Sequence, residues 1–135
     1  MRPSLALSIT AVFAVVSGLA FTLAPAQMMS AFGLATPTEA LIALRDAGVT
    51  LTGVGVINWL ARNATGAPLR AVLWGNIFIY GVDGLVNAWE IVAGMIPSVD
   101  AVGLVVNLAL VVMNVLALRR VRAAVVTGDE PSLSA

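Results

Sequence analysis

Residues 101–118 read AVGLVVNLALVVMNVLAL and are followed by Arg119-Arg120-Val121-Arg122. The stretch carries no charge, and its only strongly polar side chains are Asn107 and Asn114. A helix that crosses a bilayer needs about 20 mostly apolar residues, and clustered arginines mark the cytoplasmic end of such a span. The stretch therefore predicts a transmembrane helix whose C-terminal end lies in the cytoplasm.

Three further stretches have the length and composition of membrane spans, at residues 5–24, 39–61 and 71–96. The chain has 135 residues, of which 60% are apolar and 10% charged, and a mean hydropathy of +1.01. A soluble domain carries about 25% charged residues, so this composition excludes a soluble fold. The first stretch is also longer than the apolar region of a signal peptide. We predict an all-α integral membrane four-helix bundle, with one domain over residues 1–122 and a short cytoplasmic tail over residues 123–135.

Arginine placement predicts the orientation of the four spans. Six of the seven cations fall on one side of the membrane: Arg2, Arg62, Arg70, Arg119, Arg120 and Arg122. The loops at residues 25–38 and 97–100 contain none. The positive-inside rule then puts both termini in the cytoplasm. In the first outer loop, residues 25–34 predict a short interfacial helix that ends at Gly33.

The third span carries a row of polar side chains. Asn76, Tyr80, Asp83, Asn87 and Glu90 follow one another at spacings of 4, 3, 4 and 3 residues, which places them on one face of a helix. Lipid cannot satisfy their hydrogen bonds. This face, which we call the polar stripe, is therefore expected to meet the bundle interior, a partner or a water-filled cavity.

Depths estimated from a helical rise of about 1.5 Å per residue sort the polar residues into two layers. The inner layer contains Asn58, Asn76 and Asn114, and the outer layer contains Arg45, Asp46, Glu90 and Asn107, with Asn87 just below it. Tyr80 and Asp83 lie between the layers. We interpret the inner asparagines as structural hydrogen-bonding groups between helices.

The outer layer predicts an ion pair between Arg45 and Glu90, because the planar guanidinium group can bind a carboxylate in two places. Asp83 is favoured as a functional residue, because a carboxylate near the midplane is costly and has no cation at its depth. The first span has no polar residue stronger than serine or threonine, so we expect it to face lipid or a partner.

Several short segments together resemble one group of membrane proteins. They are Pro25, Phe32-Gly33-Leu34, Arg45-Asp46-Ala47-Gly48, Gly53, the arginine-bearing second loop and the aspartate of the third span. Over residues 15–118 the chain resembles the small four-span bacterial proteins grouped as DoxX-like. The resemblance implies a four-helix membrane bundle in the inner membrane of a bacterial cell, and it supplies no activity. Some DoxX-like proteins are accessory subunits of membrane oxidoreductases, but this chain lacks the Cys and His that direct redox chemistry would favour.

The favoured function is non-enzymatic binding of a lipid or a small lipophilic or amphipathic ligand in a polar pocket between the second, third and fourth spans. The expected pocket residues are Arg45, Asp46, Tyr80, Asp83, Asn87, Glu90 and Asn107, with Met28, Met29 and Phe32 as a lid. Two alternatives are an accessory or assembly subunit of a larger membrane complex and a proton-coupled small transporter. An enzyme is less favoured, because no set of nucleophile, base and orienting group is visible.

The same residues limit the expected partners. Without Cys or His the usual zinc sites are missing, and we expect neither a metal nor a cofactor. No basic run suits nucleic acid. The expected partners are the lipid bilayer, the lipophilic ligand, and either another membrane protein or a second copy of the chain.

Overall fold

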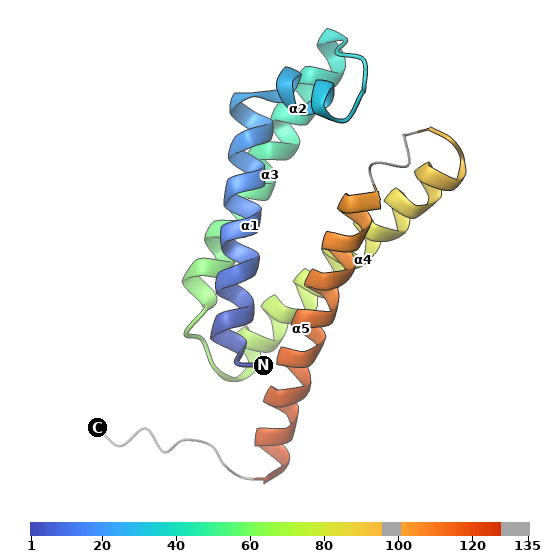
Figure 1. The fold of residues 1–135 in the computed structure, drawn as a ribbon. Coiled ribbons are helices and arrows are strands. Elements are labelled where there is room, and N and C mark those ends of the chain that lie inside the picture. Colours follow the sequence, from blue (N-terminus) through green and yellow to red (C-terminus); the bar gives the residue numbers. More distant parts are fainter. Residues whose placement is uncertain (96–100, 128–135) are drawn as a thin grey trace.

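The computed structural model describes residues 1–95 and 101–127, with side chains through residue 124. The helices in this part of the chain are α1 (Pro3–Leu23), α2 (Pro25–Ala31), α3 (Thr38–Ala61), α4 (Gly66–Val92) and α5 (Ala101–Thr127). All of them except α2 are long and apolar enough to cross a membrane. The predicted all-α membrane fold, with four spans and a short helix in the first loop between them, is confirmed (Figure 1).

Two helices end at a glycine in the left-handed conformation. Gly33 follows α2 and Gly94 follows α4, and each has a φ of 70°. After α4, the Met95 amide donates a hydrogen bond to the Glu90 carbonyl at 2.9 Å, as in a Schellman cap. The prediction that Gly33 ends the interfacial helix is thus confirmed. The predicted end of the third span at residue 96 is wrong, because the cap at Gly94 ends α4 at Val92.

The remaining helix boundaries are close to the predicted spans. α1 and α3 match theirs within two residues, whereas α4 begins at Gly66 instead of residue 71. α5 continues to Thr127, past the predicted end at residue 118. Arginine ends an apolar span without ending the helix, since it is a good helix former. The predicted tail therefore begins as helix. The predicted loop at residues 97–100 and residues 128–135 of the tail lie outside the described residues.

α1 and α3 form a closely packed antiparallel pair. A Cβ atom added to Gly48 would lie 2.6 Å from the Gly18 carbonyl oxygen, and one added to Gly18 would lie 2.6 Å from the Gly48 carbonyl oxygen. The Thr22 hydroxyl donates to the Gly18 carbonyl at 2.8 Å, and the Thr52 hydroxyl donates to the Gly48 carbonyl at 2.9 Å. Small residues at a helix contact allow the two backbones to approach, and here they allow almost direct backbone contact.

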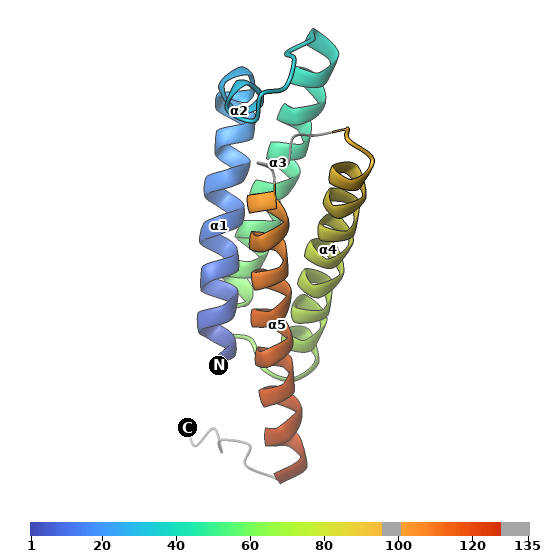
Figure 2. The same ribbon diagram turned by 45° about the vertical axis from the view of Figure 1, so that its right-hand side comes forward.

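The expectation that the first span is the helix most turned to lipid or a partner is wrong, because α1 has the largest buried share of the four spans. α1 packs against α3 on one side and against α5 on another (Figure 2). Its buried residues are Ala6, Leu7, Thr10, Ala11, Ala14 and Gly18. α1 has few strongly polar side chains, but helices in lipid associate through small residues and van der Waals packing, and α1 is rich in small residues.

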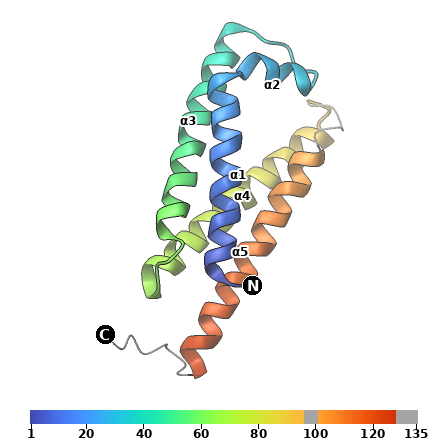
Figure 3. The ribbon, with the colours of Figure 1, turned by 60° about the vertical axis from the view of Figure 1, so that its left-hand side comes forward.

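The two helix pairs, α1–α3 and α4–α5, meet at one end of the molecule and diverge toward the other (Figures 1 and 3). We call the end where α1 begins and α3 ends the arginine end, and the opposite end the α2 end. The apolar core lies at the arginine end and contains Ala6, Leu7, Leu69, Leu73, Ala117 and Leu118. The pairs are thus joined mainly through their halves nearest the arginine end.

Arginine and tryptophan side chains pair at the arginine end. The Arg62 guanidinium lies 4.1 Å from the centre of the Trp59 ring, and that of Arg122 lies 5.6 Å from the centre of the Trp74 ring. Both are cation–π distances, and tryptophan with arginine is typical of the boundary between membrane and water. Their position agrees with the membrane boundary predicted from the arginines at this end of the molecule.

Candidate functional site

Four buried polar side chains, one from each spanning helix, form a hydrogen-bonded chain near the arginine end. Asn76 of α4 is its centre. Its Nδ2 donates to Oδ1 of Asn58 at 2.6 Å and to Oδ1 of Asn114 at 3.1 Å, and its Oδ1 accepts from Nδ2 of Asn58 at 3.0 Å. Asn114 Nδ2 donates to Oγ1 of Thr10 at 3.3 Å. We call these four side chains the asparagine layer.

The asparagine layer is closed to solvent and internally satisfied. Its four residues are at most 2% exposed. The second donor of Asn58 bonds the Val54 carbonyl, and that of Asn114 bonds the Leu110 carbonyl, both at 2.9 Å. A buried network in which the amide groups have partners holds helices together in lipid. The geometry therefore fits the predicted structural role of Asn58, Asn76 and Asn114.

Thr10 is a member of this layer that sequence reasoning missed. A threonine in an apolar span is too common to stand out by polarity. Its position carries the signal, since Ala6, Thr10, Ala14 and Gly18 recur every four residues. Such a row of small residues is typical of a helix–helix contact, and a hydroxyl within it meets whatever the neighbouring helix presents.

Asp83 lies seven residues beyond Asn76 on α4, about 10 Å nearer the α2 end. Its side chain is exposed, and its Oδ2 accepts a hydrogen bond from Nδ2 of Asn107 at 2.6 Å. Asn107 of α5 is itself buried. The structure thus brings two predicted site residues together. An ionisable side chain deep in a membrane span is costly and usually marks a functional site.

Tyr80 occupies the position between the asparagine layer and Asp83. Its ring is buried and packs edge-on against Phe13 of α1, with the ring centres 6.3 Å apart. Among the described residues, its hydroxyl has no hydrogen-bond partner. A buried hydroxyl without a partner costs free energy, so this group can donate to a bound molecule.

The polar stripe is buried at one end and open at the other. Asn76 and Tyr80 contact α3, α5 and α1, whereas Asp83 is exposed and Asn87 and Glu90 are half-buried. The five residues share one face of α4. Asp83, Asn87 and Glu90 lie on the half of this face nearer the α2 end, where Asp83 bonds Asn107 of α5, and this half of α4 borders the region where the two helix pairs diverge (Figure 3). The stripe therefore presents two carboxylates and an amide toward that region.

Arg45 and Asp46 do not join this group. Both side chains are exposed on α3. Thirteen residues separate Arg45 from Asn58, which is about 3.6 helical turns, so Arg45 points more than a third of a turn away from the side that faces α4. The outer parts of α3 and α4, which carry Arg45 and Glu90, also diverge (Figure 1). The predicted ion pair between these two described residues is therefore wrong.

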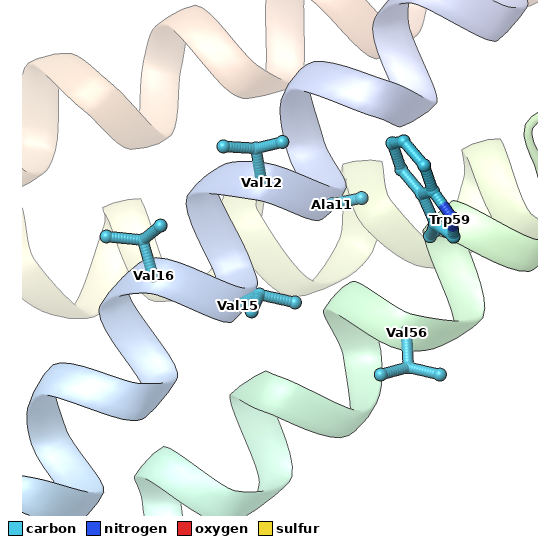
Figure 4. Close-up of a pocket in the computed structure, with 6 residues that line it drawn as sticks. All are labelled: Ala11, Val12, Val15, Val16, Val56 and Trp59. Carbon is cyan, nitrogen blue, oxygen red and sulfur yellow. The ribbon is translucent and has the colours of Figure 1, made fainter.

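A groove of about 380 Å³ lies on the outside of the α1–α3 pair (Figure 4). Its lining is entirely apolar and consists of Ala11, Val12, Val15, Val16, Val56 and Trp59. The groove differs from the predicted polar pocket both in place and in chemistry. A purely apolar groove on a spanning helix pair suits an apolar neighbour, either an acyl chain or another helix.

The described residues contain no group of three or more His, Cys, Asp or Glu side chains that could hold a metal ion. The chemistry that the stripe offers is instead hydrogen bonding and charge attraction, through the Asp83 and Glu90 carboxylates, the Asn87 amide and the Tyr80 hydroxyl.

Comparison of the chain with protein-family models, with curated proteins and with solved structures gives no match.

Proposed function

We propose that this protein is a non-enzymatic membrane protein that binds a lipid or amphipathic molecule between its two helix pairs, on the side of the α2 end. The exposure of Asp83 carries this proposal. The carboxylate lies in the middle part of a spanning helix, on a face whose inner half is fully buried. A membrane protein retains such a group where it meets water, a partner or a ligand.

The charges of the site favour an amphiphile with a basic headgroup. Asp83 and Glu90 lie on the same face of α4, and Arg45, the cation expected to balance them, points to another side of α3. An ammonium group accepts no hydrogen bonds and can donate three, which suits two carboxylates and the side-chain amide oxygen of Asn87. The alkyl chain would lie along the apolar sides of α1 and α4, with Met28, Met29 and Phe32 of the α2 segment as a lid.

The orientation and location are part of the same proposal. Six of the seven arginines gather at the arginine end, which we assign to the cytoplasm under the positive-inside rule. The site then opens toward the outer side of a bacterial inner membrane. The resemblance to DoxX-like proteins supports this location, and it leaves the ligand undefined.

Binding is tested with dodecylamine in nanodiscs of zwitterionic phosphatidylcholine. At about 100 times its Kd, the amine is expected to raise the free energy of unfolding by about 2.7 kcal/mol. Dodecanol, with the same chain and no charge, is expected to give little stabilisation. Asp83→Asn keeps the shape and the acceptor for Asn107 but removes the charge, so it is expected to lose most of the effect.

The matched control is Glu39→Gln, which removes an exposed carboxylate at the start of α3, away from the stripe. This variant is expected to respond to the amine as the unmodified chain does. Equal stabilisation of the Asp83→Asn variant, or equal stabilisation by dodecanol, would contradict the proposed site.

A further inference from the structure

The outward side of α3 carries a regular row of exposed residues. Ile42, Asp46, Val49, Gly53, Val56 and Leu60 recur at spacings of 4, 3, 4, 3 and 4 residues, and all six are exposed. Val49 is 62% exposed and Leu60 73%. This period is that of a seam along which two helices pack with a left-handed supercoil. We call these six residues the α3 seam.

One charged residue lies within the otherwise apolar α3 seam, and a residue of opposite charge lies beside it. Asp46 belongs to the seam, and Arg45 flanks it. Neighbouring residues on a helix point about 100° apart, so the two side chains of one copy do not face each other. Both are exposed on a spanning helix, where a charged group without a partner is costly. An oppositely charged surface at the same depth would relieve this cost.

We propose that the α3 seam packs against the α3 seam of a second copy, forming a parallel two-fold dimer in the membrane. Copies that insert in the same orientation are related by an axis along the membrane normal, so equal residues of the two α3 helices meet. Each Arg45 then lies beside the Asp46 of the other copy. The sequence Arg45-Asp46 is complementary to itself under this symmetry, which is why a second copy fits the seam.

The centre of the seam permits close approach. A Cβ atom added to Gly53 would meet nothing within 4 Å apart from the nearby backbone of its own helix, so this glycine is not required for packing within one copy. Gly48 and Gly55, by contrast, are in contact with α1. Gly53 thus leaves room for a second helix backbone, as small residues do in membrane helix dimers.

This inference is independent of the proposed ligand site. Asn58, which bonds Asn76, marks the side of α3 that faces α4, and the seam lies on another side of the helix. Loss of the dimer would leave the polar stripe of α4 unchanged, and loss of ligand binding would leave the seam unchanged.

Disulfide cross-linking in phospholipid vesicles tests the dimer, because the chain has no cysteine of its own. Val49→Cys and Val56→Cys each place one thiol per copy on the seam, and oxidation is expected to give a covalent dimer. Leu85→Cys and Phe78→Cys on α4 are matched controls. Their side chains are 72% and 71% exposed. Asn58 and Asn76 are hydrogen-bonded and so lie at one depth. Leu85 is as far along α4 from Asn76 as Val49 is along α3 from Asn58, and Phe78 matches Val56 in the same way. Equal cross-linking of seam and control positions, or none at the seam, would overturn the proposal.

The charge pairing is tested in the Val49→Cys background. Asp46→Arg brings four like charges together and is expected to lower the cross-linked fraction by about tenfold, since like charges across an interface disfavour the pair. The swapped variant Arg45→Asp with Asp46→Arg restores opposite pairs and is expected to restore cross-linking. Asp46→Asn, which keeps the shape of the side chain, is expected to have an intermediate effect. Undiminished cross-linking of the Asp46→Arg variant, or failure of the swap to restore it in a helical, membrane-inserted chain, would refute the pairing.

Discussion

Replacing Asn76 by leucine is expected to lower the free energy of unfolding by about 2–4 kcal/mol, since a hydrogen bond between membrane helices contributes roughly 0.6–1.7 kcal/mol. Asn76 takes part in three such bonds, two with Asn58 and one with Asn114. Leucine has a similar shape but leaves buried amide groups on both neighbours without these partners. The change is measured by reversible unfolding in mixed micelles. The control is Asn87→Leu, a half-buried asparagine on the same face of α4, which is expected to cost well under half as much.

The same network predicts strong coupling between Asn58 and Asn76. Once one of them is leucine, the other has already lost both shared hydrogen bonds. The Asn58→Leu and Asn76→Leu double variant is therefore expected to be more stable than the sum of the single losses implies, by about 1 kcal/mol or more. Additive losses, or an Asn76→Leu loss no larger than that of Asn87→Leu, would show that the asparagine layer does not act as a unit.

Replacing Gly48 by alanine is expected to destabilise the fold by about 1–3 kcal/mol, the usual cost of overfilling a packed contact. The new methyl group would lie 2.6 Å from the Gly18 carbonyl oxygen and 2.8 Å from the Thr22 backbone nitrogen. Backbone atoms cannot rotate away as a flexible side chain can, so α1 and α3 must separate along their contact. The free energy of unfolding of the variant, measured under the conditions used for Asn76→Leu, gives the size of this effect.

Gly75→Ala is the matched control for the Gly48 variant. Gly75 also lies within a spanning helix, but a Cβ atom there would have no neighbour within 4 Å. Alanine is the better helix former by up to about 1 kcal/mol, so this variant is expected to be as stable as the unmodified chain or more so. If both alanine variants gave the same stability, the close contact of α1 with α3 would not be a determinant of the fold.

Much of the candidate site follows from residue spacing alone. The intervals of 4, 3, 4 and 3 from Asn76 to Glu90 put five polar residues on one face, and the structure keeps them there. The helical rise also placed Asn58, Asn76 and Asn114 at one depth, and they are hydrogen-bonded. Depth along a helix depends only on residue number, which is why these estimates succeed.

The predicted partner of Glu90 failed for a related reason. Arg45 lies at nearly the depth of Glu90, but depth does not specify direction around the helix. The direction of α3 is set by Gly48 and Gly55, which turn toward α1, and by Asn58, which turns toward α4. Arg45 then points away from the side of α3 that faces α4 and Glu90. Packing through small residues leaves little trace in a hydropathy pattern, and this also concealed the burial of α1.

The sequence by itself determined that the chain is helical, that four segments span a membrane, that a short helix ends at Gly33, and which side of α4 is polar. These features depend on composition and on local period, which neighbouring residues fix. Only the tertiary structure decided that α1 is central, that Thr10 completes the asparagine layer, and that the helix pairs diverge and expose Asp83. These features depend on which helix faces which. In lipid, where apolar surfaces are nearly equivalent, that choice rests on close backbone contacts and a few interhelical hydrogen bonds.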